Sequence, residues 1–134
     1  MADNIFEKYF NTDYPYFVFR VFVGLLFAQH GFQKLFGMFG GKAAELFSLM
    51  GLAGTVEFIG GLAIAFGLFT RLAAFISAVE MLVAYFMAHA GTSLIPIINK
   101  GELALLYFAS FLVLMMFGAK KWSLEKAILK KEIF

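Results

Sequence analysis

Two apolar stretches, separated by only two residues, decide the fold class. Residues 52–69 read LAGTVEFIGGLAIAFGLF and residues 72–89 read LAAFISAVEMLVAYFMAH. A helix of about 20 largely apolar residues is long enough to cross the hydrocarbon core of a bilayer. Because both stretches are apolar around their whole circumference, they predict membrane-spanning helices rather than surface helices of a soluble domain. The intervening Thr70 and Arg71 predict a very tight turn.

Two further apolar stretches complete a predicted four-helix bundle. The first follows Asp13 and Pro15, which we interpret as an N-cap and a first-turn proline. The last ends at Gly118, a common residue at helix C-termini. The sequence therefore predicts an all-α fold, with residues 1–134 forming a single transmembrane domain. Its spans are expected at about residues 16–36, 52–69, 72–89 and 102–117.

The overall composition agrees with a membrane location. The chain is 62% hydrophobic and 15% charged, whereas a soluble domain is about 25% charged. Its net charge is only +2, and no basic stripe with interleaved aromatic residues indicates a nucleic-acid partner. The chain has no cysteine, which excludes a disulfide framework, a cysteine-ligated metal and a thiol–disulfide relay.

Lysine and arginine are distributed unequally between the two ends of the predicted bundle. Four spans place both termini on one side, together with Lys8, Arg71, Lys120, Lys121, Lys126, Lys130 and Lys131. The opposite side carries Lys34, Lys42 and Lys100. The positive-inside rule therefore places both termini in the cytoplasm and the chain in the cytoplasmic membrane. From Ser123 onward, apolar residues mixed with lysines predict a short amphipathic helix on the cytoplasmic surface.

Ionisable residues inside the predicted spans share helix faces with small residues. Charges in hydrocarbon are costly and normally face the bundle interior, and small residues allow the close packing that this requires. We therefore expect three stripes, each spaced by three or four residues, to face inward. They are Arg20, Gly24, Phe27, Gly31 and Lys34; Glu57, Gly61, Ile64, Leu68 and Arg71; and Ala73, Ser77, Glu80, Ala84 and Met87.

Arg20 and Glu80 are predicted to form a structural ion pair. Their depths from the starts of their helices differ by only about one turn at a rise of about 1.5 Å per residue. Such a pair can define the register of two helices without taking part in chemistry.

A second group of polar residues is predicted near the outer end of the bundle. The antiparallel path brings together His30, Lys34, Glu57, His89 and Glu102. Glu57 or Glu102 alone would neutralise Lys34, so the additional carboxylate and the histidines mark a candidate cofactor-binding cluster. His89 fits least well, because it lies about 180° from Glu80 on an ideal helical wheel. A metal site is disfavoured, since no His-x-x-His or Glu-x-x-His spacing is present.

The order of these residues resembles the DoxX family of small membrane proteins. The resemblance extends over about residues 16–123, and no single motif carries it alone. The matching features are Arg20 and Gly24, HGFQK at 30–34, Glu57 with Gly60-Gly61, GLFTR at 67–71, Glu80-Met81 with Ala84, NKGE at 99–102, and Trp122-Ser123.

This resemblance implies a four-helix bundle in the cytoplasmic membrane of a bacterium or an archaeon. Some members of the family look like subunits of thiosulfate:quinone oxidoreductases. Others tether redox or detoxifying enzymes at the membrane, and distant relatives act as cargo receptors. Membership of the family therefore does not determine an activity.

Three functional hypotheses remain open from the sequence. The first is a membrane subunit of a quinone-linked oxidoreductase, in which histidines and carboxylates exchange protons with a quinone. The chain lacks a haem motif and a nucleotide-binding loop, so this hypothesis requires a catalytic protein partner. The second is a scaffold whose lysine-rich tail and loops recruit soluble redox or detoxifying enzymes. The third, a small transporter, ranks below both, because four short helices leave little room for a pathway unless the chain forms a homo-oligomer.

Overall fold

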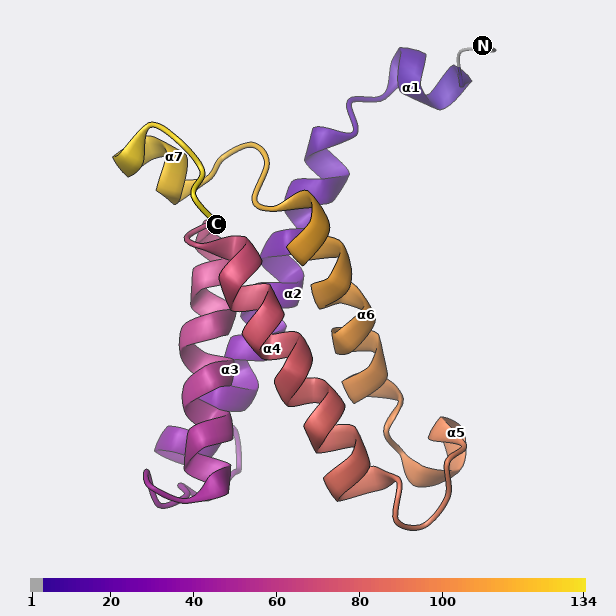
Figure 1. Cartoon of the computed structure of the whole chain (residues 1–134), viewed down its shortest axis with the longest axis vertical. Coiled ribbons are helices and arrows are strands. Elements are labelled where there is room, and N and C mark those ends of the chain that lie inside the picture. Colours follow the sequence, from indigo (N-terminus) through magenta and orange to yellow (C-terminus); the bar gives the residue numbers. More distant parts are fainter. Residues whose placement is uncertain (1–3) are drawn as a thin grey trace.

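The computed structural model describes residues 4–134, and within them four long helices lie side by side in alternating directions (Figure 1). No strand is present in this part of the chain, so the predicted all-α class is confirmed. The long helices are α2 (Asp13–Phe36), α3 (Leu49–Phe66), α4 (Thr70–Ala84), which continues as the π-helix η1 (Tyr85–His89), and α6 (Glu102–Phe117). The short helices are α1 (Ile5–Tyr9), α5 (Pro96–Asn99) and α7 (Leu124–Leu129).

Two of the long helices begin three residues earlier than the sequence indicates. Asp13 is the first residue of α2 rather than its N-cap, and its N–H is bound by the side chain of Asn11 at 2.9 Å. Pro15 is still tolerated in the first turn, where backbone N–H groups have no intrahelical acceptor. Helix α3 begins after Ser48, whose Oγ accepts the N–H of Gly51 at 3.0 Å. This serine cap lies outside the apolar run and marks the true start of the helix.

The turn between α3 and α4 is also earlier than predicted. Gly67 ends α3 in the left-handed conformation, with φ of 71°. The N–H groups of Gly67 and Leu68 donate to the carbonyls of Ile64 and Ala63, which is the hydrogen-bond pattern of a Schellman motif. The turn therefore occupies residues 67–69, and Thr70 already belongs to α4.

Helices α2 and α3 touch through their backbones. A Cβ atom added at Gly24 would lie 2.5 Å from the backbone N of Ala65, and one added at Gly61 would lie 2.5 Å from the backbone N of Ala28. Only glycine permits this approach. Most residues of the stripes predicted on α2 and α3 do face inward, since Arg20, Gly24, Phe27, Gly31, Glu57, Gly61 and Ile64 are all buried. Lys34 is half-buried at the end of the first stripe. Leu68 and Arg71 do not continue the second stripe, because α3 ends at Phe66 and both residues are half-buried beyond it.

The buried face of α4 is rotated slightly from the predicted stripe. Thr70, Ala74, Ser77, Ala78 and Met81 are its buried residues. Glu80 is half-buried at the edge of this face, and Met87 is 65% exposed. Helix α4 packs most closely on α6, where Tyr107, Phe111 and Leu114 complete a core with Phe27 and Ile64.

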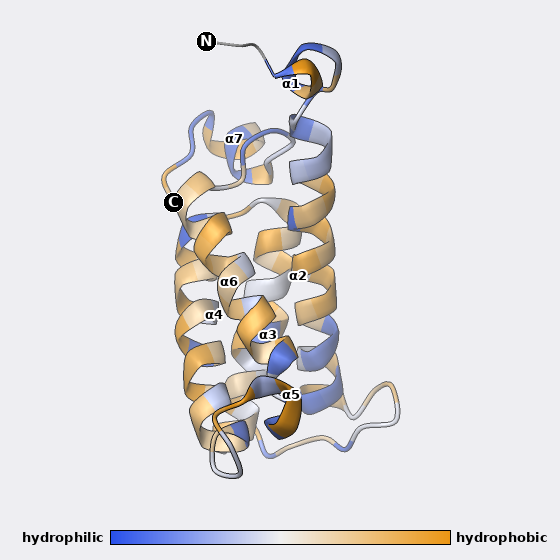
Figure 2. Cartoon of the chain, turned by 90° about the vertical axis from the view of Figure 1, so that its right-hand side faces the viewer, coloured by the Kyte–Doolittle hydropathy of each residue, from blue (hydrophilic) through white to orange (hydrophobic). Residues whose placement is uncertain are grey.

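The outside of the bundle is apolar. Figure 2 shows hydrophobic residues along the lengths of the long helices and hydrophilic residues gathered toward their ends. Among the described residues, α3 and the continuous segment Thr70–His89 are long and apolar enough to cross a membrane, and α6 is a shorter apolar helix. This exterior is suited to lipid rather than to water.

The C-terminal segment is built into one end of the bundle. A short helix, α7, forms where the sequence predicts one, but its Glu125 is fully buried. This carboxylate accepts the N–H groups of Phe69 and Ile133 at 3.2 and 2.7 Å. Ser123 donates its hydroxyl to the carbonyl of Gly67 at 2.8 Å. The tail therefore covers the α3–α4 turn as part of the folded unit.

The glycine contact between α2 and α3 provides a test of the packing. Gly61→Ala should lower the free energy of unfolding by roughly 1–3 kcal/mol, because the added methyl forces the two backbones apart. Gly91→Ala is the matched control, since no atom lies within 4 Å of the Cβ that it adds. Unfolding in detergent micelles would measure both variants. Equal stability of the two would contradict the backbone contact.

Candidate functional site

A buried ion pair joins α2 to α3. The Nζ atom of Lys34, near the end of α2, lies 2.5 Å from Oε1 of Glu57 in α3. The Glu57 side chain is 3% exposed and that of Lys34 is 27% exposed. Gly54 makes room for the lysine, because a Cβ at that position would lie 2.9 Å from Cβ of Lys34. Of the two carboxylates predicted as alternatives for Lys34, the structure selects Glu57.

Glu80 of α4 is a second half-buried carboxylate, and within residues 4–134 it forms no ion pair. It lies close enough to Glu57 and Lys34 to feel the charges of both. The Oε2 atoms of Glu57 and Glu80 are buried and have no hydrogen-bond partner within residues 4–134. Buried polar atoms are nearly always hydrogen-bonded, so these two oxygens are exceptions that call for an explanation. They leave the group with an unused capacity to accept a proton or a hydrogen bond.

His30 and Tyr107 complete the interior group. The His30 ring meets the Tyr107 ring edge-on, with ring centroids 6.0 Å apart. Both side chains lie within electrostatic reach of Glu57. We refer to His30, Lys34, Glu57, Glu80 and Tyr107 as the interior cluster. The sequence did not predict Tyr107 or Glu80 as members of this cluster. It did place Glu80 on the same inward stripe as Ser77, but paired it with Arg20.

His89 does not join the interior cluster. It ends the π-helix η1, and its Nδ1 lies 3.1 Å from the carbonyl oxygen of Asn99. The wider π turn changes the register of the helix, so His89 faces the α5 connection. Tyr85 anchors the same connection, since its hydroxyl donates to the carbonyl of Leu94 and accepts from the side chain of Asn99, both at 3.0 Å.

Glu102 is also separate from the cluster. It is the exposed first residue of α6, where the helix dipole favours a carboxylate, and it forms no ion pair with any residue from 4 to 134. His30, Lys34 and Glu57 are thus brought together as predicted, and His89 and Glu102 are not. His30, Glu57 and Glu80 do not approach one another closely enough to share a metal ion, and no other three His, Asp or Glu side chains of the described chain do so.

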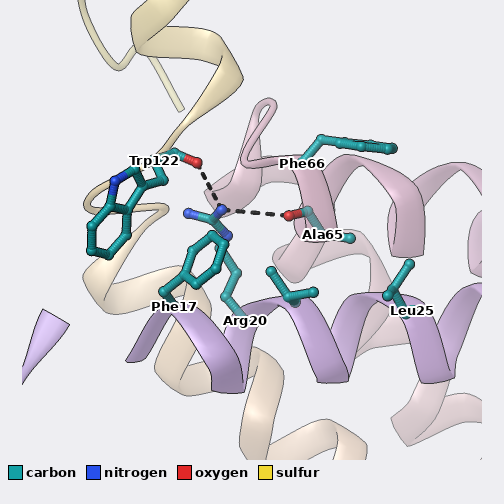
Figure 3. Close-up of a pocket in the computed structure, with 7 residues that line it drawn as sticks. Phe17, Arg20, Leu25, Ala65, Phe66 and Trp122 are labelled. Atoms are coloured by element: carbon teal, nitrogen blue, oxygen red, sulfur yellow. Dashed lines mark hydrogen bonds between the residues drawn. The ribbon is translucent and has the colours of Figure 1, made fainter. Parts of the chain in front are cut away.

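The predicted pair of Arg20 and Glu80 is wrong. The guanidinium of Arg20 donates to the carbonyls of Ala119 and Lys121 at 2.5 and 3.0 Å. It also donates to the carbonyls of Trp122 and Ala65 at 2.9 and 3.4 Å (Figure 3). Helical side chains lean toward the N-terminus of their helix, and in α2 this direction leads to the α7 end, away from Glu80. The carbonyls after the end of α6 have no helical partner, and Arg20 satisfies them.

A double-mutant cycle on Lys34 and Glu57 tests the ion pair. Glu57→Gln or Lys34→Met alone should destabilise the protein by roughly 1–3 kcal/mol, less than a fully buried pair because the lysine is partly exposed. The double variant should lose less than the sum of the two, since neither partner is left unpaired. Lys42→Met, at an exposed position, is the control. Additive losses in detergent unfolding would contradict the pair.

Comparison with known proteins agrees with this architecture. The DoxX family model matches residues 16–90, which include every member of the interior cluster except Tyr107. A protein of Haemophilus influenzae strain Rd, described as an uncharacterized protein, is 40% identical over 137 residues, covering 96% of this chain and 99% of its own length. No solved structure gives a significant match. The chain therefore belongs to the DoxX family of membrane proteins.

Proposed function

We propose that this chain is a membrane subunit of a quinone-linked oxidoreductase system, in which the interior cluster exchanges protons with a lipid-soluble carrier. The observation that carries the proposal is the pair of buried, unpartnered carboxylate oxygens of Glu57 and Glu80 inside an apolar bundle. Carboxylates in such a place mark proton or substrate pathways in membrane proteins. Proton exchange also needs groups that can both take up and release a proton close to the carrier.

A groove whose lining includes Val56 and Ser77, close in sequence to Glu57 and Glu80, has the chemistry to hold a quinone ring. It lies between α3 and α4, has a volume of about 300 Å³, and is lined mainly by apolar side chains such as Val56, Ile59 and Leu72. Ser77 also lines it, and the hydroxyl of this serine is fully buried without a partner in the described chain. A quinone carbonyl is an acceptor that suits this donor. Glu80 follows Ser77 by one turn of α4.

The division of roles follows from these positions. A quinone would supply reversible uptake of electrons together with protons. In this chain, Ser77 would orient the ring, the carboxyl of Glu80 would hold the proton, and Lys34 would keep Glu57 in place. The sequence contains no cysteine, so electrons would come from a catalytic partner protein rather than from a thiol of this chain.

The proposal includes an orientation in the cytoplasmic membrane. Helices α2, α3, α4–η1 and α6 would each cross it. Helices α1 and α7 lie at the same end of the bundle as the α3–α4 turn (Figure 1). That end carries Arg71 and most of the lysines, so the positive-inside rule supports a cytoplasmic location for both termini.

Quinone binding to the purified chain in lipid nanodiscs tests the site. Ser77→Ala should weaken the binding of a short-chain quinone by roughly fivefold, the effect of one hydrogen bond. Ser110→Ala is the control, because the Ser110 hydroxyl lies outside the groove and donates to the carbonyl of Leu106 in its own helix. With the redox partner present, His30→Ala and Glu57→Gln should both lower turnover. Unchanged affinity in Ser77→Ala, or unchanged turnover in the other two variants, would refute the site.

A second candidate function is a scaffold for soluble enzymes. It is favoured by the α7 end of the molecule, which exposes Lys130 and Lys131, and by α1, which extends away from the bundle and exposes Phe6 and Phe10 (Figure 1). Exposed aromatic residues are enriched at protein interfaces, and the lysines would steer an acidic partner toward them.

Charge removal distinguishes the scaffold from the redox subunit. Lys130→Gln with Lys131→Gln should abolish co-purification of soluble enzymes and leave the unfolding temperature unchanged, because both side chains are exposed. Lys42→Gln with Lys100→Gln, at the opposite end, is the matched control. Truncation of the tail is less informative, since Glu125 and Ser123 hold the α3–α4 turn. An unchanged partner set would contradict docking at this end.

A further inference from the structure

A second groove lies between α2 and α3 at the α7 end of the bundle. Its volume is about 440 Å³. Apolar side chains form its walls, with Phe17, Val21 and Leu25 on α2 and Phe66 on α3, while Trp122 closes it at the α7 end (Figure 3). Arg20 is the charged residue that lines it.

Arg20 makes no ion pair in the described chain, although Glu132 lies within electrostatic range of it. The residue is fully buried, and no carboxylate of residues 4–134 lies within ion-pair distance of it. Its terminal nitrogens donate to neutral carbonyls, and its Nε–H has no partner. A buried cation without an ion-pair partner is unfavourable, and a bound anion next to the groove would reduce that cost.

We propose that this groove binds an anionic phospholipid, with its phosphate beside Arg20 and Trp122 and an acyl chain along Val21, Leu25 and Phe66. Three properties of the groove support this occupant. Its walls are apolar and its exterior faces the hydrocarbon, which suits an acyl chain. Trp122 marks headgroup depth, since tryptophan is enriched at membrane interfaces. The guanidinium, which makes no ion pair within residues 4–134, favours a lipid with net negative charge over a zwitterionic one.

The occupant is a lipid rather than a free anion because the polar part of the groove is small. Arg20 is covered by the Phe17 ring, whose centre lies 5.3 Å from the guanidinium carbon. A soluble phosphate would have to leave water for a site bounded by aromatic rings. A phospholipid brings its phosphate to this depth already attached to the membrane.

Trp122 is the only tryptophan of the chain, so its fluorescence reports on the groove directly. The full chain in nanodiscs would be titrated with lipids that carry bromine on the acyl chain, which quenches tryptophan on contact. Brominated phosphatidylglycerol should quench at about fivefold lower mole fraction than brominated phosphatidylcholine, the preference expected from one cationic residue. Equal quenching by the two lipids would overturn the proposal.

Two variants test whether the preference for phosphatidylglycerol arises in this groove. Val21→Phe should fill the groove and remove the preference for phosphatidylglycerol, whereas Val18→Phe places the same ring on an exposed part of α2 outside the groove and should retain it. If Val21→Phe keeps the preference, the groove is not the site. Excess inorganic phosphate should leave the quenching unchanged. Loss of the preference in phosphate would identify a soluble-anion site and overturn the lipid assignment.

Discussion

The backbone contact between α2 and α3 is the constraint on which the rest of the structure depends. Gly24 and Gly61 lie so close to the opposite helix that a methyl group at either position would overlap its backbone. This approach sets the register of the two helices and brings Lys34 against Glu57. It also leaves α2 and α3 as a tight pair, while α4 packs chiefly on α6. Ser77 and Glu80 lie on α4, and Oγ of Ser77 and Oε2 of Glu80 find no hydrogen-bond partner in residues 4–134.

The two ends of the bundle use different side chains to hydrogen-bond the backbone groups at the helix ends. Carbonyl groups at the end of a helix need partners, and an apolar surrounding supplies none. At the α7 end, Arg71 donates to the carbonyls of Met115 and Met116, Arg20 binds those beyond α6, and Glu125 accepts N–H groups from the turn and the tail. At the opposite end, Tyr85 and Asn99 hold the connection that carries α5. The arginines therefore satisfy backbone carbonyls at one end, and the interior cluster lies in the other half of the bundle.

The interior cluster differs from these structural contacts because it contains one carboxyl group more than its lysine can pair with. Lys34 is matched by Glu57, whereas Glu80 faces the same space and adds a second carboxylate. Arg20 shows the opposite imbalance, a buried cation that is bonded only to neutral carbonyls. The two sites lie in different halves of α2, separated by the packed glycines and Phe27. One site is suited to a proton and the other to an anionic headgroup, so they can act independently.

The sequence by itself determined the all-α class, the approximate positions of the long helices, the inward stripes on α2 and α3, and the grouping of His30 with Lys34 and Glu57. These features depend on apolar length and helical periodicity, which are properties of the local chain. Only the tertiary structure decided the partner of Arg20, the place of Glu80 and the separation of His89. The direction in which the Arg20 side chain leans, the free carbonyls beyond α6 and the π turn before His89 each depend on contacts between distant segments. A wheel drawn for each helix alone contains none of that information.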